Sequence, residues 1–156
     1  MKPSDGLNLA LTIAQQQREQ AGQMLAQVLR AQLHAQRQMD QLQSYAQETE
    51  MRWTRQAQQN ATPEWMRHHY QFMERLYHAI HLQQQTLEQC ARHVHDARQG
   101  LLAIDVRIMR LSKVIAGRER ELRAQAERSE QKTMDQLAAV THRLHQQRSS
   151  GAGDWV

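Results

Sequence analysis

The chain has 156 residues, of which only 4% are aromatic, and it contains 6 glycines and 2 prolines. So few large side chains exclude a thick globular core and favour long helices that pack through a narrow apolar seam. The net charge of +4 comes from interspersed charges of both signs, which predicts solvated helix faces and no nucleic-acid partner. One cysteine excludes an internal disulfide, and no apolar run could span a membrane, so we expect a cytoplasmic protein.

The first predicted helix covers residues from about 6 to about 58. Asp5 is a candidate N-cap, because its carboxylate can accept hydrogen bonds from the free N–H groups of the first turn. Apolar residues then recur in alternating steps of four and three from Leu7 to Trp53. This spacing is typical of a left-handed coiled coil. Polar residues at seam positions fix the register of a coiled coil although they cost stability. The stripe contains three of them: Arg18, Gln32 and Thr49.

A predicted turn over residues of about 59–62 separates this helix from the next. Thr62 can cap the second helix, Pro63 fits its first position, and Glu64 suits its positive N-terminus. Together they predict a sharp helix start. Because the turn is short, the two helices must fold back antiparallel.

The second predicted helix covers residues from about 63 to about 148 and carries an apolar stripe of the same period from Met66 to Ile115. If the turn centres on Ala61, facing residues lie at equal distances along the chain from Ala61. A slip of seven residues would match the two stripes equally well, so the turn selects the register. The expected partners include Leu42 with Ile80, Trp53 with His69 and Leu11 with Leu111.

These elements predict an all-α fold, a long antiparallel two-helix coiled coil that forms a hairpin rod over residues 1–148. The first helix is used up where it reaches Ile115. Residues from about 116 onward therefore have no partner within the chain, and we expect them to form a single charged helix. Opposite charges four residues apart, such as Glu119 and Arg123, help such a helix to persist in water. Residues 149–156 are predicted to be a disordered tail.

The sequence offers no constellation that could carry out catalysis. The histidine pairs at helical spacing lack a cysteine or carboxylate that would complete a zinc set. No phosphate-binding loop, nucleophile elbow or metalloprotease motif is present. We therefore expect neither an enzyme nor a metal or other cofactor.

Aromatic residues gather near the turn. The structural interpretation is that they pack together and close the end of the hairpin. The functional interpretation is a docking patch, because large side chains on a thin rod have little to cover them. Both interpretations stay open for this set: Tyr45, Trp53, Trp65, Tyr70, Phe72 and Tyr77.

The order of segments resembles the FliJ family, the small coiled-coil component of the flagellar type III export apparatus. The resemblance runs from about Leu7 to about Val140. It is carried by the combination of "QFMERL" after the turn, at residues 71–76, and "AERSEQKTMDQ" near the end, at residues 126–136. The resemblance implies a hairpin similar to the central stalk of rotary ATPases. It also implies that the chain inserts into the ring of the export ATPase FliI, binds the cytoplasmic part of the gate protein FlhA, and interacts with export chaperones.

The resemblance implies two sets of binding residues and a location at the inner-membrane export apparatus. Two of the implied gate-binding residues, Leu42 and Leu76, are also seam positions. The gate-binding set is Gln38, Leu42, Tyr45, Phe72, Leu76 and Ala79. The ATPase-binding set is Arg128, Gln131, Lys132 and Asp135.

Two other functions remain open from the sequence. One is the equivalent stalk protein of a virulence type III secretion system, which the residues separate poorly from a flagellar one. The other is a generic self-associating scaffold, in which the unpaired helix would pair with a second copy. An amphipathic membrane-surface protein is disfavoured by the Gln-rich outer faces.

Overall fold

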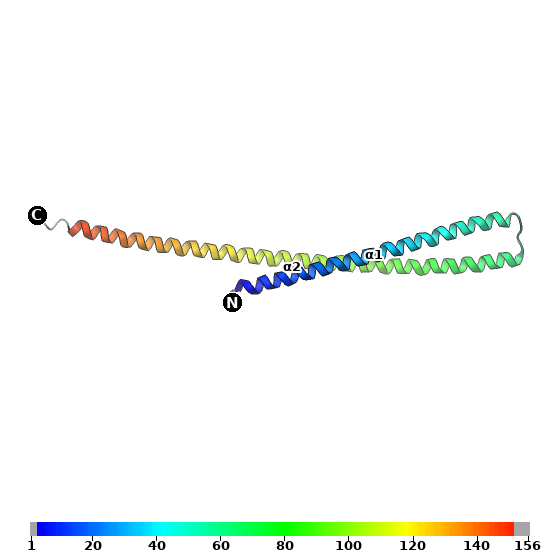
Figure 1. The fold of residues 1–156 in the computed structure, drawn as a ribbon, viewed down its shortest axis with the longest axis horizontal. Coiled ribbons are helices and arrows are strands. Elements are labelled where there is room, and N and C mark those ends of the chain that lie inside the picture. Colours follow the sequence, from blue (N-terminus) through cyan, green and yellow to red (C-terminus); the bar gives the residue numbers. More distant parts are fainter. Residues whose placement is uncertain (1–2, 152–156) are drawn as a thin grey trace. The chain divides into compact units, whose positions relative to one another are not determined.

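The protein is described by a computed structural model that covers residues 3–151. It contains two helices, α1 (Pro3–Ala57) and α2 (Pro63–Gly151), and no strand within the described range (Figure 1). The helices fold back on one another through a single turn over residues 58–62. The predicted fold class, an all-α antiparallel helical hairpin, is confirmed. Neither described helix has a segment apolar enough to cross a membrane.

The turn is built as the sequence predicts. The Thr62 hydroxyl accepts a hydrogen bond from the backbone N–H of Trp65 at 3.3 Å, so Thr62 is the N-cap of α2. Its carbonyl accepts the N–H of Met66 at 3.1 Å, the first hydrogen bond of the helix. At the other side of the turn, the carbonyl of Gln56 accepts the N–H groups of Gln59 and Asn60 at 3.0 Å each, which ends α1.

The C-terminal end of α2 differs from the expectation. We expected residues 149–156 to be disordered, but Ser149, Ser150 and Gly151 are the last residues of the helix. The reason is local hydrogen bonding: the Ser149 hydroxyl donates to the carbonyl of Gln146 at 2.9 Å, and the Ser150 hydroxyl donates to the carbonyl of Gln147 at 3.2 Å. These bonds occupy the two hydroxyls within the helix, so the serines do not compete with it as they do in turns. The rest of the predicted tail lies outside the described residues.

The chain divides into two compact units, and each is described by itself. The turn unit comprises residues 13–107 and therefore contains the turn. The terminal unit comprises the described residues 3–12 and 108–151.

The core of the turn unit is thin. No polar residue is buried among the described residues. One cluster lies near the turn and joins both helices: Ala46, Met73 and Leu76 are buried in it, and Leu42 and Ile80 pack against it. The burial of small and medium side chains on both helices is what the sparse apolar stripe predicts. The buried residues are Ala14, Ala35, Met39, Ala46, Met73, Leu76 and Val94.

Contacts across the turn unit support the predicted register. The rings of Trp53 and His69 stack with their centroids 4.3 Å apart, as expected for residues equally far from Ala61. Far from the turn, Arg18 forms an ion pair with Asp105 through its Nε atom. The arginine in the apolar stripe therefore reaches a carboxylate next to Ile104, the residue of α2 that is equally far from Ala61.

In the terminal unit, one apolar stripe of each helix is half-buried: Leu7, Ala10 and Leu11 on α1, and Ile108, Leu111 and Ile115 on α2. Leu9, Met109 and Val114 lie off this stripe and are exposed. Beyond Gly117 the pattern changes. Every described residue of 118–151 is exposed, apart from the half-buried Ala124. A helix of this length extends about 50 Å at 1.5 Å per residue.

Candidate functional site

The expected gate-binding residues of α1 line a common groove in the turn unit. Gln38, Leu42 and Tyr45 border a space of about 450 Å³ together with Gln41 and with Gln83 of α2. The Gln83 amide donates to the Gln38 side-chain oxygen at 3.3 Å and to the Ala35 carbonyl at 2.8 Å. The floor of the groove is therefore held by hydrogen bonds between the two helices.

Tyr45 and Phe72 form an aromatic pair that joins α1 to α2. Their ring centroids are 6.0 Å apart and the planes meet at 80°, an edge-to-face contact. Yet Tyr45 is 48% exposed and Phe72 is 40% exposed. The two interpretations of these aromatics are therefore compatible. The rings pack on each other and still present apolar surface on one side.

Of the other four expected gate residues, Gln38 is exposed and three are less accessible. Leu76 is only 8% exposed and belongs to the core cluster. Leu42 and Ala79 are half-buried, and Leu42 packs against the same cluster. A partner that covers this face can touch Tyr45 and Phe72 directly, whereas Leu76 supports the surface from beneath.

A second groove, the turn-end groove, shares Phe72 with the aromatic pair and has a volume of about 310 Å³. Its walls are aromatic: Trp53 stacks on Trp65 with centroids 5.7 Å apart and planes 8° apart. Phe72 belongs both to this groove and to the pair with Tyr45. Its lining residues are Thr49, Arg52, Trp53, Gln56, Trp65, His68, His69 and Phe72.

Sequence reasoning missed the polar residues of this turn-end groove. The signal was present in the spacing. Thr49, Arg52 and Gln56 follow Tyr45 in steps of four, three and four, which keeps them on one face of α1. His68 precedes Phe72 by four residues on α2. Extending the patch along these steps would have found the groove.

Two groups at the turn end have perturbed environments. Burial against the tryptophans lowers the pKa of the His69 imidazole, and the nearby Glu50 carboxylate opposes this shift. The Tyr77 hydroxyl donates a hydrogen bond to Glu50. That bond, with smaller effects of burial and of the Glu50 charge, raises the pKa of Tyr77. The indole N–H of Trp53 is buried without an acceptor.

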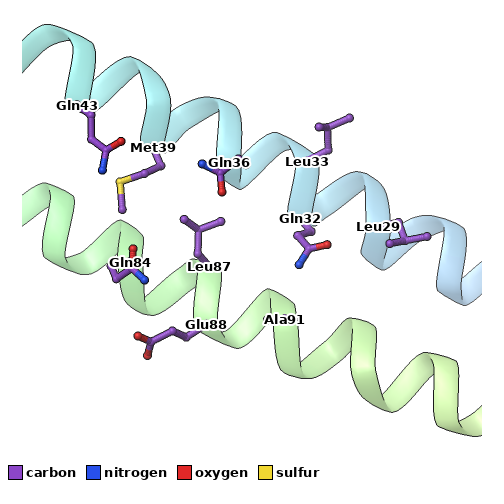
Figure 2. A pocket seen from close by; sticks show the side chains of 10 residues that line it. All are labelled: Leu29, Gln32, Leu33, Gln36, Met39, Gln43, Gln84, Leu87, Glu88 and Ala91. Atoms are coloured by element: carbon purple, nitrogen blue, oxygen red, sulfur yellow. The ribbon is translucent and has the colours of Figure 1, made fainter.

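A third groove, of about 630 Å³, was also not predicted (Figure 2). In Figure 2, Met39 and Leu87 point into the space between the helices, whereas Leu33 points away from α2. Because its α1 residues differ from those beside Tyr45 by a large rotation about the helix axis, this groove occupies a different flank. Its rim is rich in glutamine, and Glu88 is its charged residue: the lining comprises Leu29, Gln32, Leu33, Gln36, Met39, Gln43, Gln84, Leu87, Glu88 and Ala91.

The expected ATPase-binding residues lie in the exposed part of α2. Arg128, Gln131, Lys132 and Asp135 are separated by steps of three, one and three, so they share one face of the helix. The Gln131 amide donates to the Asp135 carboxylate at 3.1 Å. Both cationic side chains of the set are exposed. The set is therefore an exposed polar face of the helix.

Within residues 3–151, no group of three or more histidine, cysteine or carboxylate side chains is arranged to hold a metal ion. The three grooves are open and lie along a two-helix surface. Their residue content suits contact with another macromolecule better than enclosure of a small substrate.

Comparison with known proteins gives one clear match. The sequence model of the family described as "Flagellar FliJ protein" matches residues 4–147. No curated protein and no solved structure matches the chain. The matched range covers the positions of both expected sets of binding residues. The family is a non-catalytic component of the flagellar type III export apparatus, so the match connects the chain to flagellar protein export. Because this model matches nearly the whole length of the helical hairpin, the chain belongs to the FliJ family of flagellar proteins.

Proposed function

We propose that this protein is a stalk that links the flagellar export ATPase FliI to the export gate protein FlhA. The exposed part of α2, residues 118–151, inserts into the ring of the ATPase. The aromatic pair of Tyr45 and Phe72 binds the cytoplasmic domain of the gate protein. The observation that supports this proposal most directly is a long exposed helical segment that packs against no other part of residues 3–151, in a chain of the FliJ family.

The ATPase end is argued from exposure and charge. A lone helix in water gains little from tertiary packing, so the exposed segment of α2 would gain stability from contacts inside a partner's pore. Its face of Arg128, Gln131, Lys132 and Asp135 offers both donors and acceptors. Apolar side chains that are exposed here add contact area: Leu122, Met134, Leu137, Val140 and Leu144.

The gate end is argued from exposed aromatic surface. Rigid aromatic side chains dominate many protein interfaces because they bury much area for little loss of rotamer freedom. The contact between Tyr45 and Phe72 fixes both rings before binding, so the two side chains lose little conformational entropy when a partner binds.

The protein itself performs no chemistry in this proposal. A single helix in a symmetric ring contacts different subunits differently, and this asymmetry changes the ATPase. Consequently the purified protein alone does not hydrolyse ATP, and its effect appears only when the ATPase is present.

The experiment is a two-partner binding test with the purified ATPase and the purified gate domain. Truncation after Gly117 removes the exposed segment and leaves the paired helices. We expect this variant to lose ATPase binding and to keep gate binding. The double variant Tyr45→Ala/Phe72→Ala should do the reverse.

A point variant sharpens the ATPase test. Lys132→Ala changes the proposed binding face, and Arg123→Ala changes another exposed cation on a different face of the same segment. Weaker ATPase binding for Lys132→Ala alone supports the assigned face. If the truncated chain still binds and stimulates the ATPase as the full chain does, the stalk proposal is wrong.

The proposal extends to location and to chaperones. As a partner of both proteins, the chain is cytoplasmic and gathers at the inner-membrane export apparatus, and it handles export chaperones there. A fluorescent fusion should form foci that disappear in cells without the gate protein. Copurification with purified export chaperones tests the second part, and absence of all such complexes would remove it.

A further inference from the structure

The turn-end groove shares only Phe72 with the expected sets of binding residues, and it has the composition of a site for an acidic side chain. We propose that it extends the gate-binding patch and receives a carboxylate of the gate protein's cytoplasmic domain. The inference rests on the proposed function, because it assumes that the gate domain covers Tyr45 and Phe72. It adds Arg52, Gln56 and His68 to the surface.

Continuity is the first argument. Phe72 contacts Tyr45 on one side and lines the turn-end groove on the other. On α1, Arg52 and Gln56 share a helix face with Tyr45. A protein that covers the aromatic pair would therefore reach the mouth of the groove without leaving this flank. The separate groove of Figure 2 lacks this continuity, because its lining contains neither aromatic residue.

The chemistry of the lining is the second argument. The residues that border the groove include no carboxylate. They include the Arg52 guanidinium, the Gln56 amide and the His68 imidazole, which can all donate hydrogen bonds. Apolar walls from Trp65 and Phe72 would shield such bonds from water. A guanidinium beside aromatic walls suits a carboxylate, which it can bind with two parallel hydrogen bonds.

Arg52 remains available although it has a neighbour. Its Nη2 atom lies 3.8 Å from Glu48 Oε2, one turn earlier in α1. The two side chains are 71% and 61% exposed, so their pair is screened by water and is easily exchanged. Glu50, the next acidic residue along α1, accepts a hydrogen bond from the Tyr77 hydroxyl and does not line the groove.

Charge also excludes the alternatives. A basic side chain at this place would meet Arg52 with like charge, and a purely apolar one would cover the guanidinium without replacing its water. A carboxylate satisfies the donors as a neutral carbonyl would, and in addition it offers the arginine a full negative charge.

The test is calorimetric titration of the full chain with the purified gate domain, at about 0.05 M and about 0.5 M salt. Arg52→Glu should weaken binding about tenfold or more at the lower salt, and Arg52→Gln about threefold, with a smaller dependence on salt than the wild type. Arg30→Glu is the matched control. Arg30 is exposed on the same helix and lines none of the grooves described, so its variant should bind within about twofold of the wild type.

The outcomes separate the inference from the proposed function. If the wild-type chain does not bind the gate domain, the proposed function fails and the inference with it. If the wild type binds, Phe72→Ala weakens binding, and Arg52→Glu binds as tightly as Arg30→Glu, the inference alone is overturned. Selective loss for Arg52→Glu with an unchanged helical circular dichroism spectrum supports the acidic partner.

Discussion

Replacement of Leu76 by alanine separates the two roles that overlap at the gate-binding patch, support of the fold and contact with the partner. Leu76 is 8% exposed and packs with Ala46 and Met73 in the core cluster. Truncation of a buried leucine costs about 2–5 kcal/mol in the free energy of unfolding. Since a core only two helices wide can close around the gap or admit water, we expect a loss of about 2–3 kcal/mol.

The assay is thermal unfolding followed by far-ultraviolet circular dichroism. A loss of this size lowers Tm by roughly 4–12 °C for a chain of this length. Leu82→Ala is the matched control, because it makes the same chemical change one to two turns later on α2, where the leucine is 49% exposed. Its effect should stay within about 0.5 kcal/mol.

Binding measurements complete the comparison. At 25 °C the Leu76→Ala hairpin should remain folded, because the loss is smaller than the stability of a typical domain, about 5–15 kcal/mol. We therefore expect Phe72→Ala to weaken gate binding more than Leu76→Ala, although Phe72→Ala destabilises the fold less. Equal Tm values for Leu76→Ala and Leu82→Ala would refute the assignment of Leu76 to the core. Stronger loss of binding for Leu76→Ala than for Phe72→Ala would refute the division of roles.

Three further predictions concern the fold. Thr62→Ala removes the cap of α2 and should lower the free energy of unfolding, measured with urea, by about 0.5–2 kcal/mol. Thr62→Ser should keep most of the wild-type value. Full stability of the alanine variant would contradict the capping role. Arg18→Ala and Asp105→Ala should show a coupling of about 0.2–1 kcal/mol in a double-mutant cycle, reduced at high salt, and zero coupling at low salt would count against the ion pair. Burial lowers the pKa of His69 in the folded state below the unfolded value near 6.5, so between those values the unfolded chain binds more protons. The free energy of unfolding therefore falls as the pH drops through about 6.5, and the loss is complete below the folded pKa. On this acidification Tm should fall less in His69→Gln than in the wild type. Parallel profiles of Tm against pH would show that His69 does not contribute.

Much of the fold could be predicted because it follows from two regular features. The spacing of apolar residues fixes which helix face is buried, and Thr62 with Pro63 fixes where the chain reverses. Together they set the register, which the stacking of Trp53 on His69 confirms. The end of α2 was harder to predict, since serine and glycine have low intrinsic helix propensity, and the hydroxyls of Ser149 and Ser150 bond to carbonyls within the helix.

The surfaces were less predictable than the seam. The periodicity of apolar residues determines which helix faces meet. The contacts between side chains beside the seam depend in addition on rotamers and on the angle between the helices. The contact between Tyr45 and Phe72 is of this kind, because it joins residues that are not equally far from the turn. The turn-end groove depends on the stacking of Trp65 over Trp53, which the sequence spacing alone does not determine.

The pairing of residues at equal distances from the turn limits how chains of this architecture can change in length. One residue inserted into the paired part of either helix would rotate every side chain beyond it by about 100° and move the apolar stripe off the seam. Seven residues inserted into one helix restore the rotation but misalign Arg18 with Asp105. Gains and losses in this part must therefore come as whole heptads, in both helices, at matching distances from Ala61. The segment beyond Gly117 has no facing residue in the described chain, so its length can change without a matching change in α1.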